Sequence, residues 1–208
     1  MIRVAVDPLR QDMAAMANLV DVLRSGGIVA YPTDTMYGLA VDPRSDTAVE
    51  HLFEVKARDR TAAVALIAAD VAQAQQAGMF GASELVLARA FWPGPLTIVV
   101  PASRQLSPSL TGDLQTVGVR VPAHAVAQAL AAAFTSCITA TSANLSGRPP
   151  AVTADEVAAA LGSSIDAVID AGPAPGGAPS TIVEIVNHRP VLRRNGAIAW
   201  DRVLESLQ

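Results

Sequence analysis

The sequence predicts an α/β fold built on a twisted, mixed β-sheet flanked by helices. Short aliphatic runs alternate with stretches of helical periodicity, which is typical of β-α-β units. Other apolar runs follow one another directly, so some neighbouring strands should be antiparallel. Hydrophobic residues make up 51% of the 208 positions, enough for a sizeable core, and this length favours one domain over 1–208.

Strands are predicted where short apolar runs stop at proline, glycine or polar residues. These runs occupy 2–6, 28–31, 62–68, 96–102, 115–122, 137–142, 166–170, 180–186 and 190–196. Helices are predicted where apolar residues recur every three or four positions. These stretches are 13–23, Asp46 to the basic cluster at 56–60, 83–92, 123–134, the segment after Thr153, and 200–207.

Several element boundaries have recognisable sequence signals. Gly26 and Gly27 can end the first helix, and Pro93 can end the helix predicted at 83–92. Asp46 is expected to cap its helix, and Thr153 with the glutamate three residues later forms a capping-box pattern. Residues 171–180 form the one linker-like segment, which suits a hinge, a lid or a plain surface loop.

Charge and cysteine content exclude several classes of protein. A net charge of −4 argues against a generic nucleic-acid coat or a basic membrane anchor. Cys137 is the single cysteine, so no internal disulfide can form, which fits a reducing cytosol; within its apolar run it is expected to be a buried hydrophobe. The first twelve residues lack a signal-peptide core, and 125–144 fits a helix followed by a strand better than a membrane span. We therefore expect a cytoplasmic protein without a membrane segment.

Common catalytic and nucleotide-binding motifs are absent from the sequence. It contains no GxxxxGK[ST] phosphate loop, no GxGxxG after a strand, no HExxH or CxxC pair and no GxSxG elbow. His51, His124 and His188 are scattered and are expected to be surface or hydrogen-bonded histidines, so no metal site is predicted. If the chain binds a nucleotide, it must hold the phosphates by other means.

Polar clusters instead gather at or near the ends of predicted strands. They are PTDTMYG at 32–38, KAR at 56–58, TSAN with SG at 141–147, and PST at 179–181 followed by Arg194. Loops at strand ends are where α/β sheets usually bind ligands. Each cluster also has a structural explanation, because threonine, serine and asparagine beside proline and glycine are ordinary turn formers.

Of the basic residues, Arg120 is the hardest to explain by local structure alone, whereas Lys56 and Arg58 lie near a helix end, where cations suit the helix dipole. Arg120 interrupts a run of valines, and a charge on a strand face needs a partner or a ligand. Thr116 lies four residues earlier, which places both on one face of the strand. Lys56 and Arg58 can contact one ligand only if the backbone leaves the helix there, because residues two apart do not share a helix face.

Taken together, these segments resemble the YrdC family, the threonylcarbamoyl-AMP synthases. The matching text is GGIVAYPTDTMYGLA, KAR, FWPGPLTIVV, TVGVRVP, TSANLSGRPP, PSTIVE and LRRNG, in family order over most of 25–196. The resemblance implies the YrdC-like twisted sheet with a concave ligand cavity, and the single-domain form of the family.

The resemblance also implies a reaction. L-threonine, bicarbonate and ATP would give threonylcarbamoyl-AMP and diphosphate, with Mg²⁺ on the triphosphate. A second protein system would transfer the threonylcarbamoyl group to the adenosine beside the anticodon of certain tRNAs, and weak RNA binding by this chain fits that role. An anion that attacks a polyanion needs cations, so positioning and charge stabilisation should carry the catalysis.

Site residues follow from the same motifs. Threonine would be bound by Thr35, Arg120, Ala140 and Ser180, with Thr33 and Tyr37 close by. ATP would be bound by Lys56, Arg58, Thr116, Ser142, Asn144 and Arg194, and the catalytic charge would come from Lys56 and Arg58 with Arg194.

The chain departs from the family pattern after KAR. Many members have Asn or Lys, then Pro-Leu, then His three residues later, where this chain has Ala62, Ala63, Val64 and Ile67. Ala62 cannot form a side-chain hydrogen bond to the nucleotide, and Ile67 cannot form one to threonine. Two alternatives stay open: a non-catalytic RNA-binding module, which the acidic pI of about 5.3 disfavours, and a carbamoyl-adenylate enzyme with another acceptor.

Overall fold

A computed structural model describes residues 1–7, 13–57, 59 and 64–208. It confirms the predicted α/β class with one mixed sheet. The strands are β1 (Ile2–Ala5), β2 (Val29–Pro32), β3 (Tyr37–Ala40), β4 (Ala65–Ile67), β5 (Leu96–Pro101), β6 (Thr116–Arg120), β7 (Ile138–Ser142), β8 (Ala167–Asp170), β9 (Thr181–Val186) and β10 (Arg189–Arg194). The helices are α1 (Met13–Arg24), α2 (Asp46–Val55), α3 (Val71–Ala74), α4 (Ala82–Phe91), α5 (Pro108–Thr111), α6 (Ala125–Phe134), α7 (Ala154–Leu161), the 3₁₀ turn η1 (Gly162–Ser164) and α8 (Trp200–Glu205).

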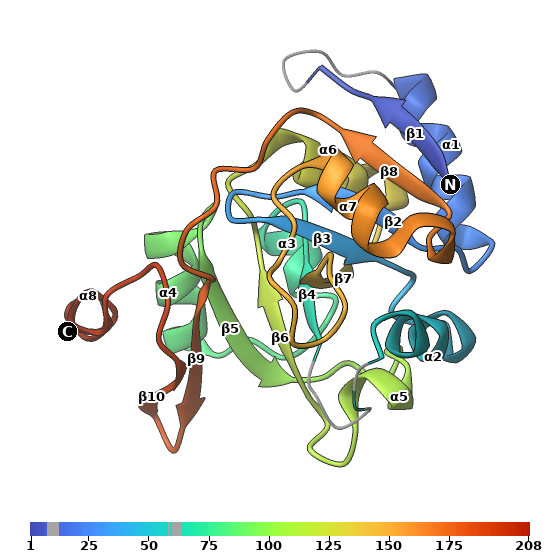
Figure 1. The fold of residues 1–208 in the computed structure, drawn as a ribbon. Helices are drawn as coiled ribbons and strands as arrows, with labels where there is room; N and C mark the ends of the chain where they lie inside the picture. Colours follow the sequence, from blue (N-terminus) through green and yellow to red (C-terminus); the bar gives the residue numbers. More distant parts are fainter. Residues whose placement is uncertain (8–12, 58, 60–63) are drawn as a thin grey trace.

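The strand order is β1-β8-β2-β3-β7-β4-β6-β5-β9-β10, so strands distant in sequence become neighbours (Figure 1). β8 lies parallel to β1 and β2, and β4 lies parallel to β6. β3 and β4 both run antiparallel to β7, which therefore joins the two halves of the sheet. The direct connections that predicted antiparallel pairs are the β2–β3, β5–β6 and β9–β10 neighbours.

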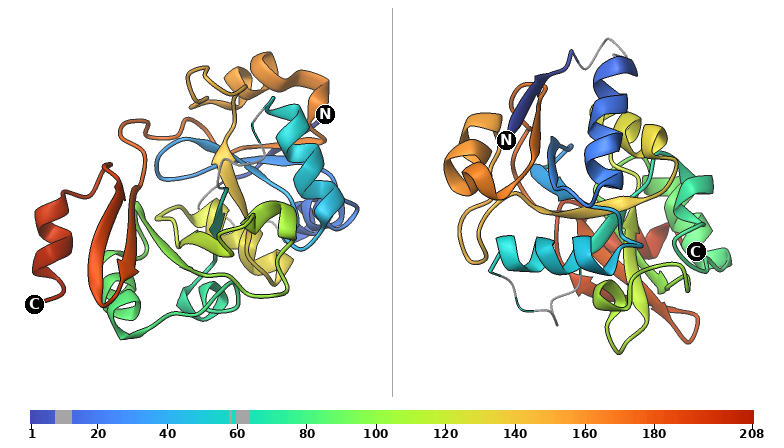
Figure 2. Two further views of the ribbon diagram at one scale, coloured as in Figure 1. Left: turned by 90° about the horizontal axis from the view of Figure 1, so that it is seen from below. Right: turned by 90° about the vertical axis from the view of Figure 1, so that its right-hand side faces the viewer.

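The two faces of the sheet are covered by different helices (Figure 2). α1 packs beside α6 on one face, where it contacts β2, and α7 packs against β8 on the other. Alternation along β2 explains how one strand serves both faces: Val29 and Tyr31 join the apolar cluster of α1 and α6, whereas Ile28 and Ala30 join the larger cluster with α2, α4 and α7.

Local signals explain most element boundaries, with one correction. The cap of α2 is Ser45, whose side chain accepts a hydrogen bond from the Ala48 N–H, and not Asp46. Asp46 is the first helical residue, and its carboxylate accepts hydrogen bonds from Ser107 Oγ and from the Ser109 N–H instead. Thr153 caps α7 as predicted, accepting from the Glu156 N–H.

Some predicted elements differ in extent. The predicted strand at 62–68 is β4, three residues long among the described positions, and Ala62 and Ala63 lie outside them. Strand β3 was not predicted, because its sequence YGLA continues the hydroxyl-rich stretch. Cys137 is buried as expected, and burial raises its thiol pKa to about 12.

No helix in the described part of the chain is both long enough and apolar enough to span a membrane.

Candidate functional site

A cavity of about 500 Å³ opens where the central strands end. It draws residues from the β2–β3 turn, β4, β6, β7 and the segments before β9 and at the end of β10. Its lining residues are Tyr31, Thr33, Thr35, Met36, Tyr37, Gly38, Ala65, Leu66, Ile67, Thr97, Arg120, Ala140, Thr141, Ser142, Asn144, Arg148, Pro150, Gly177, Pro179, Ser180, Ile182 and Arg194. This volume falls within the range typical of small-molecule sites.

The hydroxyl-rich stretch forms the turn between β2 and β3. Thr33 Oγ1 donates to the Met36 carbonyl at 2.7 Å and accepts from the Thr35 N–H at 3.2 Å, so this side chain closes the turn. The hydroxyls of Thr33 and Thr35 lie 3.1 Å apart, and both line the cavity. Tyr37 Oη donates to the Gly172 carbonyl at 2.8 Å, which ties the turn to the segment after β8.

Arg120 ends β6 with its guanidinium against the same turn. Its Nη2 lies 3.0 Å from Asp34 Oδ1, and the two side chains are 8% and 11% exposed, respectively. Burial lowers the pKa of Arg120, and the neighbouring Asp34 and Tyr31 offset part of that effect. The valine-flanked charge therefore has a partner in Asp34, and because it also lines the cavity, its contact with a ligand stays a prediction.

Within the described part of the chain, the carboxylate of Asp34 has this ion pair but no hydrogen bond, and His124 has a buried nitrogen that lacks one too. Among the described residues, the buried side-chain atoms without a hydrogen bond are Asp34 Oδ1, Asp34 Oδ2 and His124 Nδ1. Burial lowers the pKa of His124, while the charge of Asp34 raises it. The prediction that all three histidines are at the surface or satisfied holds for His51 and His188, which are exposed, but is wrong for His124.

Ser180 connects two walls of the cavity. Its Oγ lies 2.8 Å from Thr97 Oγ1 on β5 and accepts a hydrogen bond from Arg194 Nη2 at 3.0 Å. Arg194 also donates to the Ser180 carbonyl through Nε at 3.1 Å and Nη2 at 2.9 Å. The guanidinium on β10 is thus oriented by the segment that precedes β9.

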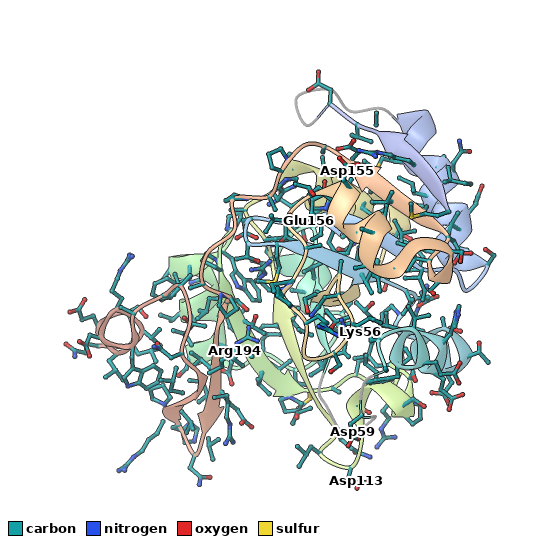
Figure 3. The ribbon with its side chains drawn as sticks, in the orientation of Figure 1. Lys56, Asp59, Asp113, Asp155, Glu156 and Arg194 are labelled. Atoms are coloured by element: carbon teal, nitrogen blue, oxygen red, sulfur yellow. The ribbon has the colours of Figure 1, made fainter. Side chains whose placement is uncertain are left out.

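Lys56 holds the loop that follows β7. α2 ends at Val55, and Ala57 adopts a left-handed conformation with φ of 47°. The backbone therefore leaves the helix here, as Lys56 and the arginine two residues later require if both are to contact one ligand. The buried ammonium of Lys56 donates to the carbonyls of Ser142 and Asn144, the latter at 2.7 Å. Figure 3 shows Lys56 and Arg194 reaching the central region from different elements.

The structure brings most of the predicted site residues to one cavity. Seven predicted ligand-binding residues line it: Thr35, Arg120, Ala140, Ser142, Asn144, Ser180 and Arg194. Lys56 and Thr116 are not among the lining residues, since Lys56 lies behind the loop it holds and Thr116 begins the strand that Arg120 ends. Arg58 lies outside the described residues.

The departure from the family pattern also falls at the cavity. Ile67 pairs with Arg120 in the β4–β6 register and is fully buried. It presents an aliphatic wall beside the guanidinium, where a histidine would add a polar group. Ala62, the other departure, is outside the described residues.

Sequence reasoning did not assign roles to three residues of this region. Asp34 stands inside the PTDT motif, and Thr97 stands inside GPLT, so the motifs already contained them. Arg148 stands inside TSANLSGRPP, but an exposed arginine beside prolines gave no reason to assign it a role.

The described residues contain no group of three or more histidine, cysteine, aspartate or glutamate side chains placed to hold a metal ion.

Comparison of the sequence with known proteins identifies the family and its relatives. The family model for Sua5/YciO/YrdC proteins, described as "Telomere recombination", matches residues 21–196. Threonylcarbamoyl-AMP synthase of Pyrococcus abyssi is 36% identical over 182 residues, which is 87% of this chain and 54% of that protein. The Vibrio cholerae enzyme of the same name is 43% identical over 164 residues, 76% of this chain and 87% of that protein. The chain therefore spans about half the length of the Pyrococcus relative.

A solved structure of a family member has a similar fold. The crystal structure of P. abyssi Sua5 complexed with L-threonine superposes with a TM-score of 0.90 at 33% identity, over 99% of this chain and 60% of that one. The described residues therefore share the fold of the matched 60% of that chain.

Proposed function

Because the chain belongs to the Sua5/YciO/YrdC family, we propose that it is a threonylcarbamoyl-AMP synthase, a nucleotidyltransferase that uses L-threonine, bicarbonate and ATP. The observation that carries the proposal is the cavity that combines a buried, oriented arginine with a row of hydroxyls and further arginines. Such a site can bind an amino-acid carboxylate and a polyphosphate together. Relatives that bear this enzyme's name, and one that binds L-threonine, support it.

Arg120 would bind the threonine carboxylate. The ion pair with Asp34 uses Nη2 of Arg120, and the planar guanidinium has further N–H groups that can donate to a second carboxylate. Thr35, Ser180 and the Ala140 backbone line the same cavity and would complete the amino-acid pocket. Ile67 would pack against the aliphatic part of the substrate, so the site can accept threonine without a polar group at that position.

Arg194, Ser142 and Asn144 would form the nucleotide side. Arg194 is oriented through Ser180, which links the amino-acid and nucleotide groups in one hydrogen-bond network. We place Lys56 differently from the sequence prediction, because its ammonium already donates to backbone carbonyls of the loop. Lys56 would then position Ser142 and Asn144, while the contacts of Arg58 and Thr116 with ATP remain predictions.

The reaction follows from these positions. The threonine amine condenses with bicarbonate to give an N-carboxylate and water. An oxygen of this carbamate attacks the α-phosphorus of ATP, the bond from that phosphorus to the bridging oxygen breaks, and diphosphate leaves. The protein would hold the two anions in line and balance their charge, with no covalent intermediate on a side chain. Mg²⁺ would enter with the triphosphate and be bound by phosphate and water oxygens.

The product would serve a second protein system that modifies adenosine in tRNA. That partner reaction rests on the family relationship, and so do the expected cytoplasmic location and weak RNA binding.

Diphosphate release tests the proposed function. Purified chain with ATP and bicarbonate should release diphosphate only when L-threonine is present, and serine should replace it poorly. Arg120→Ala should raise the KM for threonine much more than the KM for ATP, because it removes the carboxylate contact. Release that ignores threonine would indicate another acceptor, and no release with salt-sensitive tRNA binding would indicate an RNA-binding module.

A further inference from the structure

Among the described residues, three arginines line the cavity, and two of them have acceptors of their own. Arg120 faces Asp34, and Arg194 donates to Ser180. Arg148 is the third, and its side chain is exposed at the cavity. No described residue accepts a hydrogen bond from its guanidinium or forms an ion pair with it. Its donors are therefore available to a ligand.

The backbone that carries Arg148 is held from several sides. The Arg148 N–H donates to the Leu145 carbonyl at 3.0 Å, which closes a turn. Asn144 Nδ2 donates to the carbonyls of Leu145 and Arg148, and Lys56 holds the carbonyl of Asn144. A long cationic side chain thus extends from a loop whose backbone is fixed by hydrogen bonds, and it lines the cavity.

This loop carries residues of the nucleotide side. Ser142 and Asn144 come from the same segment, and Arg194 lines the cavity with them. A nucleotide bound there would bring its polyphosphate to a site with positive charge and hydrogen-bond donors. Arginine suits a phosphate because its planar guanidinium can donate two parallel hydrogen bonds.

We propose that Arg148 binds the β- and γ-phosphates of ATP and stabilises diphosphate as it leaves. The inference rests on the proposed function and adds a residue to its nucleotide side. When the bond to the α-phosphorus breaks, negative charge grows on the bridging oxygen of the departing diphosphate. A guanidinium at that group stabilises the charge without a proton transfer.

The test measures binding of inorganic diphosphate to the full chain by titration calorimetry. Arg148→Ala is compared with wild type, with Arg148→Lys and with Arg89→Ala. Arg89 is exposed on α4 and does not line the cavity, so its removal changes the net charge equally. Thermal unfolding of each variant checks the fold, which an exposed side chain should not affect.

Arg148→Ala should weaken diphosphate binding by about 10- to 100-fold, the loss expected for one or two charge-assisted hydrogen bonds. Arg148→Lys should fall between it and wild type, because lysine keeps the charge and loses the paired geometry. Arg89→Ala should bind as wild type does. In turnover assays Arg148→Ala should raise the KM for ATP and leave the KM for threonine unchanged.

Equal binding by Arg148→Ala and Arg89→Ala would overturn the inference, as would a wild-type chain that does not bind diphosphate. The binding experiment needs no turnover, so it separates this inference from the proposed function. A chain that binds diphosphate through Arg148 but releases none from ATP would contradict the synthase and support the arginine's phosphate contact.

Discussion

Asp34 is the counter-ion of a buried arginine, and its removal should cost the fold a large and recoverable free energy. Arg120 as a whole residue is 6% exposed, and its Nη2 lies 3.0 Å from Asp34 Oδ1. Removing one partner of a buried pair leaves an uncompensated charge, which costs about 3–5 kcal/mol. For a chain of this size, 1 kcal/mol shifts the melting temperature by about 2–4 °C, so Asp34→Ala should melt roughly 6–20 °C lower.

The recovery distinguishes a lost counter-ion from general damage. L-threonine should raise the melting temperature of Asp34→Ala more than that of wild type, because its carboxylate supplies the missing negative charge at Arg120. The double variant Asp34→Ala with Arg120→Met should regain most of the stability, since no buried charge is left. Urea unfolding of wild type, Asp34→Ala, Arg120→Met and the double variant completes the thermodynamic cycle.

Two results would refute this reasoning. Asp34→Ala could unfold within about 1 kcal/mol of wild type, which would mean that water reaches Arg120 and replaces the pair. Alternatively, the double variant could be as unstable as the two single losses added together. Strict additivity would show that the two side chains do not interact.

Other predictions address the fold around the site. In Gly196→Ala the new Cβ would lie 2.5 Å from the carbonyl carbon of Ser180, so this cavity segment must shift. The free energy of unfolding should fall by about 1–3 kcal/mol. Diphosphate release should fall, while the circular dichroism spectrum should keep its secondary-structure signal. The pKa of Cys137 is raised to about 12, so a thiol reagent near neutral pH should label it only after denaturant is added, and rapid native labelling would contradict its burial. Hydrogen bonds from Arg3 lower the pKa of Asp170, so their stabilisation is present above the ordinary carboxyl pKa and lost as pH falls through the lowered one. Arg3→Ala should therefore destabilise the chain near neutral pH, with a gap to wild type that closes in acid; a gap independent of pH in urea unfolding would exclude this pair as its source.

The fold could be predicted from sequence where the hydrophobic period was clear. The helices at 83–92 and 123–134 and the strand at 96–102 match α4, α6 and β5 closely. β3 could not be predicted, because tyrosine and glycine after a polar turn resemble a loop until the partner strand is known. The short helices α3 and α5 have too few turns to show a period.

The sequence motifs could predict which residues gather at the candidate site, but not the contacts between them. Seven of the residues that the family resemblance assigned to ligand binding line the cavity, because polar groups at strand ends stand out in an apolar chain. The motifs could not show that Lys56 donates to backbone carbonyls of the loop after β7, since that contact joins residues 86 and 88 positions apart. Nor could they show that Asp34 faces Arg120, which depends on the order of strands in the sheet.

The strand order has a consequence for synthesis on the ribosome. The cavity takes walls from β2, β4, β6 and β7, and its remaining wall from the Ser180 and Arg194 segments. A nascent chain that has emerged only as far as β8 can pair its central strands, yet β5 still lacks its parallel neighbour β9. Non-local pairing of this kind folds slowly. The ligand site is therefore among the last parts of this fold to form, and ligands can stabilise it only after translation has passed Arg194.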